Sequence, residues 1–156
     1  MARTDYFNDP DAPRPNSIVI AVSAFVLDKD AQLLMIRRTD NGYYALPGGR
    51  HELGETMTQT VVRETQEETG MTVEVTSLVG IYSNPDHVMA YDDGEVRQEF
   101  SICFRARPVA GAPRTSDESS EVVWVPRAEL AGIEVHPSIR LRIDHGFRTD
   151  APPYYT

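Results

Sequence analysis

One stretch of this chain is predicted to be a helix with a crowded acidic face. Residues 56–69 contain neither proline nor glycine, and Leu46-Pro-Gly-Gly49 interrupts regular structure just before them. Gly70 stands where a helix C-terminus favours a residue that tolerates a left-handed backbone. With about 100° of rotation per residue, three carboxylates fall within an arc of about 100° on this helix. They belong to Glu64, Glu67 and Glu68.

This acidic face has two interpretations. The simpler one is a solvated surface, because charged runs are common on exposed helices. However, like charges at this spacing destabilise a helix by about 0.2–0.5 kcal/mol per pair, and the negative end of the helix dipole adds to the cost. Divalent cations would relieve this repulsion, since Mg²⁺ and Ca²⁺ prefer carboxylate oxygens. The upstream Gly48-Gly49 favours the metal interpretation, because glycines let the backbone approach a ligand closely.

Length and charge restrict the kinds of partner. A chain of 156 residues suits a single domain, and its net charge of −9 argues against DNA or RNA polymers, which bind basic surfaces. A small phosphorylated ligand is compatible with this charge if cations lie between it and the carboxylates. The single cysteine, Cys103, excludes an intrachain disulfide and is expected to be buried in a strand.

No membrane partner is expected. The longest apolar run, residues 18–27, is too short to span a bilayer, and the N-terminus lacks an apolar signal core. The sequence therefore predicts a soluble, cytoplasmic protein. It leaves open whether the chain is a monomer or a homodimer.

The order of expected elements is that of a mixed α/β fold rather than a regular alternation of strands and helices. Helices are expected at residues 56–69 and 137–146, with one helical turn at 126–130. Strands are expected at residues 18–27, 32–37, 73–82, 95–106 and 121–125, with loops at 83–94 and 107–116. Residues 1–16 are predicted to be an N-terminal arm, residues 17–146 the domain, and residues 147–156 a C-terminal tail.

The charged and glycine positions around the helix form a longer pattern that resembles the Nudix box of the Nudix (MutT-like) hydrolases. It reads Gly49-x5-Glu55-x7-Arg63-Glu64-x2-Glu67-Glu68-x-Gly70-Met71. Thr65 is the one departure, because the family usually has an aliphatic residue there, and that position serves packing. Leu46-Pro47 and Trp124-Val-Pro126 also look familial, so the resemblance covers about residues 17–146. It implies a Nudix α/β/α sandwich with a mixed β-sheet, in one domain.

The resemblance also implies roles for the residues of the box. Glu64, Glu67 and Glu68 would bind Mg²⁺, for which Mn²⁺ would substitute, and Glu64 would also be the general base. Gly49 would offer its backbone carbonyl to the metal. Arg63 would orient a glutamate in the catalytic group, and Glu55 would support the loop or the metal shell. Many relatives have a further catalytic glutamate outside the box; Glu118 and Glu121 are candidates, although each also fits a plain surface carboxylate.

The implied reaction is hydrolysis of a diphosphate linkage in a nucleoside diphosphate derivative, with water attacking phosphorus. An ADP-ribose-like nucleotide sugar and a nucleoside triphosphate both fit as the small nucleotide substrate. The alternative is a Nudix-fold sensor module that binds a nucleotide without cutting it. Such modules usually lose carboxylates of the box, whereas this chain retains all of them.

Substrate selection is expected outside the box, in the loop of residues 82–97, because loops often carry specificity. Tyr82 and Tyr91 could stack on a base, and Asn84 could bond to a hydroxyl or a base edge. Arg38, at the end of a strand, is a candidate phosphate contact. Tyr44 either stacks on a base or packs in the core.

Overall fold

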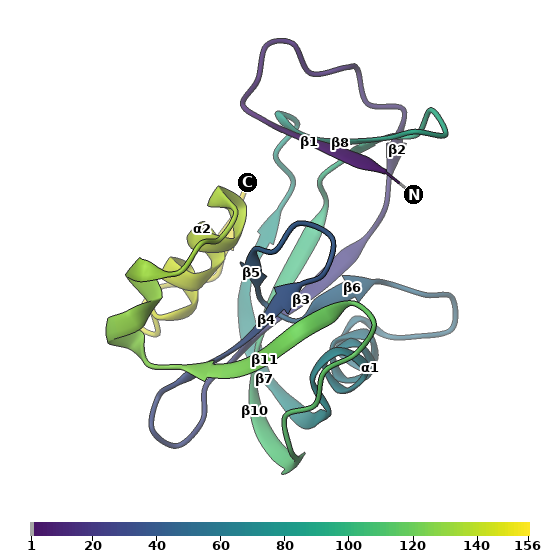
Figure 1. The fold of residues 1–156 in the computed structure, drawn as a ribbon. Helices are drawn as coiled ribbons and strands as arrows, with labels where there is room; N and C mark the ends of the chain where they lie inside the picture. Colours follow the sequence, from purple (N-terminus) through teal and green to yellow (C-terminus); the bar gives the residue numbers. More distant parts are fainter. Residues whose placement is uncertain (1) are drawn as a thin grey trace.

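The computed structural model describes residues 2–156, which form fifteen helices and strands (Figure 1). In chain order these are β1 (Arg3–Phe7), β2 (Ser17–Ile18), β3 (Ala21–Val26), β4 (Leu33–Arg38), β5 (Tyr44–Ala45), β6 (Gly48–Arg50), α1 (Met57–Thr69), β7 (Met71–Tyr82), β8 (His87–Tyr91), β9 (Val96–Gln98), β10 (Ser101–Gly111), β11 (Ser119–Val125), the 3-10 helix η1 (Arg127–Gly132), α2 (Pro137–Gly146) and β12 (Tyr154–Tyr155).

The strands form three sheets, and the two helices lie on opposite sides of the central one (Figure 1). The central sheet has the order β12-β7-β10-β3-β6, with β10 parallel to β3 and antiparallel to β7. A second sheet has the order β11-β4-β5, and a third the order β1-β8-β9-β2. Helix α1 packs against β7, β6 and β3, and α2 against β7 and β3. This confirms the expected α/β/α sandwich with mixed strands.

Strand β3 explains why the core has two halves. Val22, Ala24 and Val26 belong to the apolar cluster beneath α1, whereas Phe25 points to the cluster beneath α2. Alternate side chains of a strand point to opposite faces, so a strand between two helices must be apolar throughout. The β3 residues Val22–Val26 are accordingly all buried. None of the described helices combines the length and the hydropathy that a membrane span requires.

The predicted helix at residues 56–69 is confirmed, together with both of its ends. The Thr56 hydroxyl accepts from the Gln59 backbone N–H (3.2 Å), and the Gln59 side chain accepts from the Thr56 N–H (2.8 Å), which is a capping box. Gly70 ends the helix with φ of 76°, and its N–H donates to the Gln66 carbonyl. The sequence between the two caps therefore fixes where the acidic face begins and ends.

Several segments predicted as loops or tails instead pair as strands. The predicted N-terminal arm contains β1, which pairs antiparallel with β8. Strand β8 itself lies within residues 83–94, which were expected to be a loop. The tail holds β12, parallel to β7. The single strand expected at residues 18–27 is split into β2 and β3, the one at 95–106 into β9 and β10, and β10 runs on to Gly111. These pairings join segments far apart in the chain, so local sequence patterns do not reveal them.

The packing of α2 on β3 gives a test of the fold. A Cβ at Gly146 would collide with the ring of Phe25, which is buried. Gly146→Ala should therefore lower the free energy of unfolding by about 1–3 kcal/mol, because overpacking outweighs the gain of under about 1 kcal/mol in helix propensity. Urea unfolding measures this change.

Gly132→Ala is the matched control. Within residues 2–156, no atom lies within 4 Å of the Cβ that this change would add. It should leave the urea midpoint nearly unchanged. Equal midpoints for both variants would show that α2 can move away from β3 at little cost.

Candidate active site

Arg63 organises the acidic residues around α1. Its Nε donates to Glu55 Oε1 (2.5 Å) and its Nη2 to Glu55 Oε2 (3.1 Å), so the guanidinium binds both oxygens of this carboxylate. Its Nη1 donates to Glu64 Oε1 (2.9 Å) and to Glu67 Oε2 (3.2 Å). Nη2 also donates to the Arg50 carbonyl (3.2 Å), which ties the helix to β6. The Arg63 hydrogen bond lowers the pKa of Glu55 to about 2 and keeps that carboxylate charged.

The glycines before the helix allow Glu64 to approach the backbone. β6 pairs with β3, so that Gly49 lies opposite Val22. A Cβ at Gly49 would collide with the Glu64 carboxylate, so any other residue there would push that carboxylate out of its position. The Glu64 side chain is only 12% exposed. Burial raises the pKa of this carboxyl group against the opposing effect of Arg63, and the charges of Glu67 and Glu118 raise it further.

Glu68 is buried behind Glu64. Its Oε2 accepts a hydrogen bond from the Gly48 N–H (3.1 Å). Burial raises its pKa to about 8, the Gly48 hydrogen bond opposes that rise, and the neighbouring Glu64 and Glu118 add to it. Two desolvated carboxyl groups with raised pKa values, side by side on one helix, are a typical mark of a functional site.

The carboxylate and carbonyl oxygens near α1 are suitable ligands for a hard divalent cation, but they do not form a complete coordination shell by themselves. Glu67 is 60% exposed and is held by Arg63, so it does not join the other two carboxylates. In the part of the chain that the structure describes, no group of three or more His, Cys, Asp or Glu side chains converges enough to hold a metal ion. Mg²⁺ commonly takes one or two carboxylates together with water and substrate phosphates. Glu64, Glu68 and the Gly49 carbonyl supply such a partial set.

The two candidate glutamates outside the box occupy different surroundings. Ser119 Oγ donates to the Glu68 carbonyl (2.9 Å), which brings the adjacent Glu118 close to the end of α1. Glu121 instead accepts a hydrogen bond from the Tyr44 hydroxyl (2.8 Å) and pairs with Arg37 (3.8 Å). The geometry therefore favours Glu118 as the further glutamate near the box, and its role stays a proposal.

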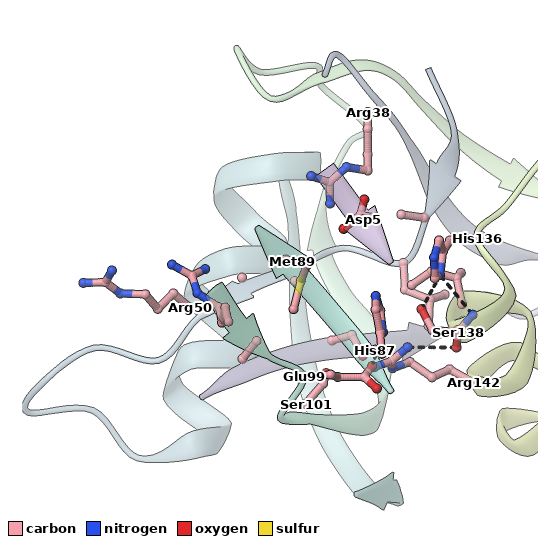
Figure 2. Close-up of a pocket in the computed structure, with 18 of the residues that line it drawn as sticks. Asp5, Arg38, Arg50, His87, Met89, Glu99, Ser101, His136, Ser138 and Arg142 are labelled. Atoms are coloured by element: carbon pink, nitrogen blue, oxygen red, sulfur yellow. Dashed lines mark hydrogen bonds and ion pairs between the residues drawn. The ribbon is translucent and has the colours of Figure 1, made fainter. Parts of the chain in front are cut away.

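A cavity of about 280 Å³ is lined at one side by strand β6, which contains Gly49. It lies among β1, β8, β9, β3, β5 and α2, so all three sheets contribute to its wall. Figure 2 shows a group of buried polar side chains at one end, with Arg38 and Arg50 away from them. Ligand pockets typically measure about 300–1,000 Å³, so the volume of this one lies just below the lower end of that range.

Three of the five predicted substrate contacts line this cavity, and each already has an intramolecular partner. Asp40 binds Arg38 through both carboxylate oxygens (2.8 and 2.6 Å). Tyr44 donates to Glu121. Arg97 lies over the Tyr91 ring (4.7 Å) and donates to its hydroxyl (3.1 Å). A substrate must share or displace these partners to use the three side chains.

The other two predicted contacts lie elsewhere. Tyr82 is 3% exposed and packs in the core beneath α2, where its hydroxyl bonds to His145 Nδ1 (2.8 Å). It cannot stack on a base, because its ring has no open face; this prediction was wrong. Asn84 is not part of the cavity wall and accepts a hydrogen bond from the Asp86 N–H in a turn. The expected specificity loop thus became β8 and a turn.

Sequence analysis missed the group at the buried end of the cavity. Glu99, His87 and Arg142 are buried there, and His136 stands beside them. These residues come from three separate parts of the chain, so no spacing pattern joins them. One local signal was present, since His136 precedes Pro137 at a helix start and its Nδ1 accepts from the Ser138 N–H (3.1 Å) as an N-cap.

Comparisons with known proteins agree with this geometry. The NUDIX domain model matches residues 18–144. A MutT-like protein of Streptomyces ambofaciens is 39% identical over 127 residues, which cover 81% of this chain and 76% of that protein. An ADP-ribose pyrophosphatase of Methanocaldococcus jannaschii is 40% identical over 99 residues, or 62% of this chain and only 55% of that relative.

Solved structures share the fold at lower identity. The MutT protein from Methanosarcina mazei Go1 has a TM-score of 0.67 and 24% identity, covering 92% of this chain and 100% of that one. The NUDIX domain of Shewanella oneidensis NrtR, solved with ADP ribose, has a TM-score of 0.68 and 21% identity, covering 92% and 94%.

The buried carboxyl group of Glu68 predicts a pH effect on the metal-free protein. Its pKa is about 8 in the folded state and about 4.3 in an unfolded chain. Between these values the folded state binds a proton that the unfolded state lacks, so stability falls as the pH rises. In EDTA, wild type should lose on the order of 1–3 kcal/mol more than Glu68→Gln between pH 5 and pH 8.5. Urea unfolding at both pH values checks this difference.

The amide oxygen introduced by Glu68→Gln can still accept from the Gly48 N–H, so the comparison isolates the charge. Parallel pH dependences for the two proteins would show that the Glu68 carboxylate is solvated. Added Mg²⁺ should reduce the loss in wild type at pH 8.5, because the cation neutralises the carboxylate.

Proposed function

This chain belongs to the Nudix hydrolases, and on that premise we propose that it hydrolyses a diphosphate linkage in a nucleoside diphosphate derivative with the help of Mg²⁺ or Mn²⁺. A water molecule attacks phosphorus, the bond to the bridging oxygen breaks, and a phosphorylated group leaves. The observation that carries this proposal is the close approach of the half-buried Glu64 carboxylate to Gly49, which also lines the neighbouring cavity.

Glu64 is the proposed general base. Arg63 occupies its Oε1, and Oε2 accepts no hydrogen bond within residues 2–156. Burial raises the pKa of Glu64, which makes the carboxylate a better proton acceptor than a solvated glutamate. Arg63 fixes the direction of the carboxylate through a short, charge-assisted bond. Glu55 in turn fixes Arg63, so Glu55 supports the site without touching the substrate.

The cation would be held by Glu64, Glu68 and the Gly49 carbonyl, and Glu67 would join them only if its side chain left Arg63. When bound, it neutralises phosphate oxygens and lowers the pKa of a water molecule. The protein's part is mainly positioning, because phosphoryl transfer needs little covalent chemistry from side chains.

The substrate is an ADP-ribose-like nucleotide sugar or a nucleoside triphosphate. Relatives named for both chemistries resemble this chain, the ADP-ribose pyrophosphatase of M. jannaschii and a nucleoside triphosphatase of Enterobacter at 29% identity. The alternative, a sensor that binds without cutting, is disfavoured because the box retains all its carboxylates and the arginine that holds them. The cytoplasmic location and a homodimer stay predictions.

Chromatographic analysis of the products tests the reaction: ADP-ribose should give AMP and ribose 5-phosphate, and a nucleoside triphosphate should give a nucleoside monophosphate and pyrophosphate. Activity should need Mg²⁺ or Mn²⁺ and disappear in excess EDTA. Glu64→Gln should lower kcat by about 10²- to 10⁴-fold, the usual contribution of a general base. Full turnover in EDTA would contradict the proposal.

Glu74→Gln is the matched control, because Glu74 is an exposed β7 residue paired only with Arg107 (2.7 Å). It should retain wild-type kcat. If the wild type binds ADP-ribose but releases no product under any condition, the sensor interpretation replaces the enzyme.

A further inference from the structure

The cavity beside the active site ends in a buried polar floor, which we define as Glu99, Arg142, His87, His136 and Ser101. The Glu99 and Arg142 side chains are only 8% and 4% exposed, and Arg142 Nη2 donates to Glu99 Oε1 (2.5 Å). Figure 2 shows the five residues gathered together, with Arg142 reaching in from α2. The floor therefore joins α2 to the third sheet at one end of the cavity.

A purely structural role does not account for this floor. Buried ion pairs contribute little net stability, and structural polar clusters are normally fully hydrogen-bonded. Here Arg142 Nε is buried without a hydrogen-bond partner within residues 2–156, and His87 Nδ1 is buried with only a long, poorly directed approach to Glu99 Oε1 (3.4 Å). Such a cluster is costly to keep in an interior, which favours a function for it.

Three atoms of the floor are free to bond to a ligand. Arg142 occupies Glu99 Oε1, whereas Glu99 Oε2 accepts no hydrogen bond from residues 2–156. Ser101 Oγ likewise has no partner in that part of the chain, yet neither atom is sealed from solvent. His136 Nδ1 accepts from the Ser138 N–H, so the proton of the neutral imidazole lies on Nε2.

The Glu99 carboxylate restricts what the floor can bind. Burial tends to raise the pKa of Glu99, but His87 and Arg142 outweigh this and lower it to about 2, so the carboxylate is ionised and only accepts. Its charge is balanced by Arg142. Burial lowers the pKa of His136, so that imidazole is neutral. A phosphate would meet the Glu99 carboxylate, whereas an uncharged group with N–H or O–H donors would be complementary to it.

We propose that Glu99 Oε2, Ser101 Oγ and His136 Nε2 bind an uncharged hydroxyl- or amide-bearing part of the substrate and thereby select the nucleotide. The inference rests on the proposed diphosphate hydrolysis, whose phosphates lie at the Gly49 end of the same cavity. Arg142 acts as a positioning residue, because it holds Glu99 and is itself fixed over the Tyr82 ring (4.5 Å). The group bound at the floor is either a nucleobase edge or the terminal sugar, and both present such donors.

Two variants test the floor without removing its ion pair. Ser101→Ala deletes a hydroxyl that has no intramolecular partner in the described chain. His136→Asn deletes Nε2 but keeps an acceptor that caps α2, because asparagine is a favoured N-cap. Glu99 is left intact, since removing it would strand a buried arginine. Ser120→Ala, on β11 outside the cavity wall, is the matched control.

Calorimetry with Mg²⁺ would measure the binding of three non-hydrolysable products: AMP, dGMP and ribose 5-phosphate. Each floor variant should weaken the ligand that reaches the floor by about 3- to 10-fold, the effect of one lost hydrogen bond. Ligands that do not reach it should bind as to wild type. A selective loss for AMP or dGMP assigns the floor to the base, and one for ribose 5-phosphate assigns it to the sugar.

Two outcomes overturn the proposal. One is unchanged binding of all three ligands, and the other is an equal loss for all three, which would place the effect on the shared phosphate. Thermal melting of each variant checks that α2 remains folded. Because product binding needs no turnover, an inactive wild type that still shows the selective loss would refute the proposed hydrolysis and leave the floor assignment standing.

Discussion

The hydrogen bonds of the Arg63 guanidinium are the interaction on which the active site depends. One guanidinium binds Glu55, Glu64 and Glu67 and reaches the Arg50 carbonyl, so it joins the helix entrance, the acidic face and strand β6. An arginine suits this position because its donors have a fixed planar arrangement, whereas a lysine is a point charge on a flexible stem. Without it, the carboxylates of α1 would repel one another and turn toward solvent.

The carboxyl groups of α1 lie in electrostatically unfavourable surroundings. Burial beside other carboxylates raises the pKa values of Glu64 and Glu68, and Glu68 has only the Gly48 N–H to offset its desolvation. A fold gains nothing from such an arrangement alone. In the proposed function, cations and phosphates would complete the charge balance, and the stability lost in the metal-free protein would serve complementarity to its ligands.

The cavity shows how one chain supplies two different recognition chemistries within a small volume. Gly48 and Gly49 line one end, next to the α1 carboxylates that we propose to hold a cation and the phosphates. The opposite end has the hydrogen-bonding floor around the Glu99–Arg142 pair. In our proposal the box binds the linkage that is common to all candidate substrates, and the floor binds the part that differs.

The sequence by itself determined helix α1, because its caps Thr56 and Gly70 and its acidic arc are local features of spacing. It also indicated the box residues and the mixed α/β fold, and it separated strands from helices in the core. Only the tertiary structure decided that Tyr82 is core, that β1 pairs with β8, and that Glu121 is bound by the Tyr44 hydroxyl. The buried polar floor was likewise revealed only by the tertiary structure. The physical reason is that strand pairing and burial join residues far apart in the chain, and the free energy of those contacts has no counterpart in any local pattern.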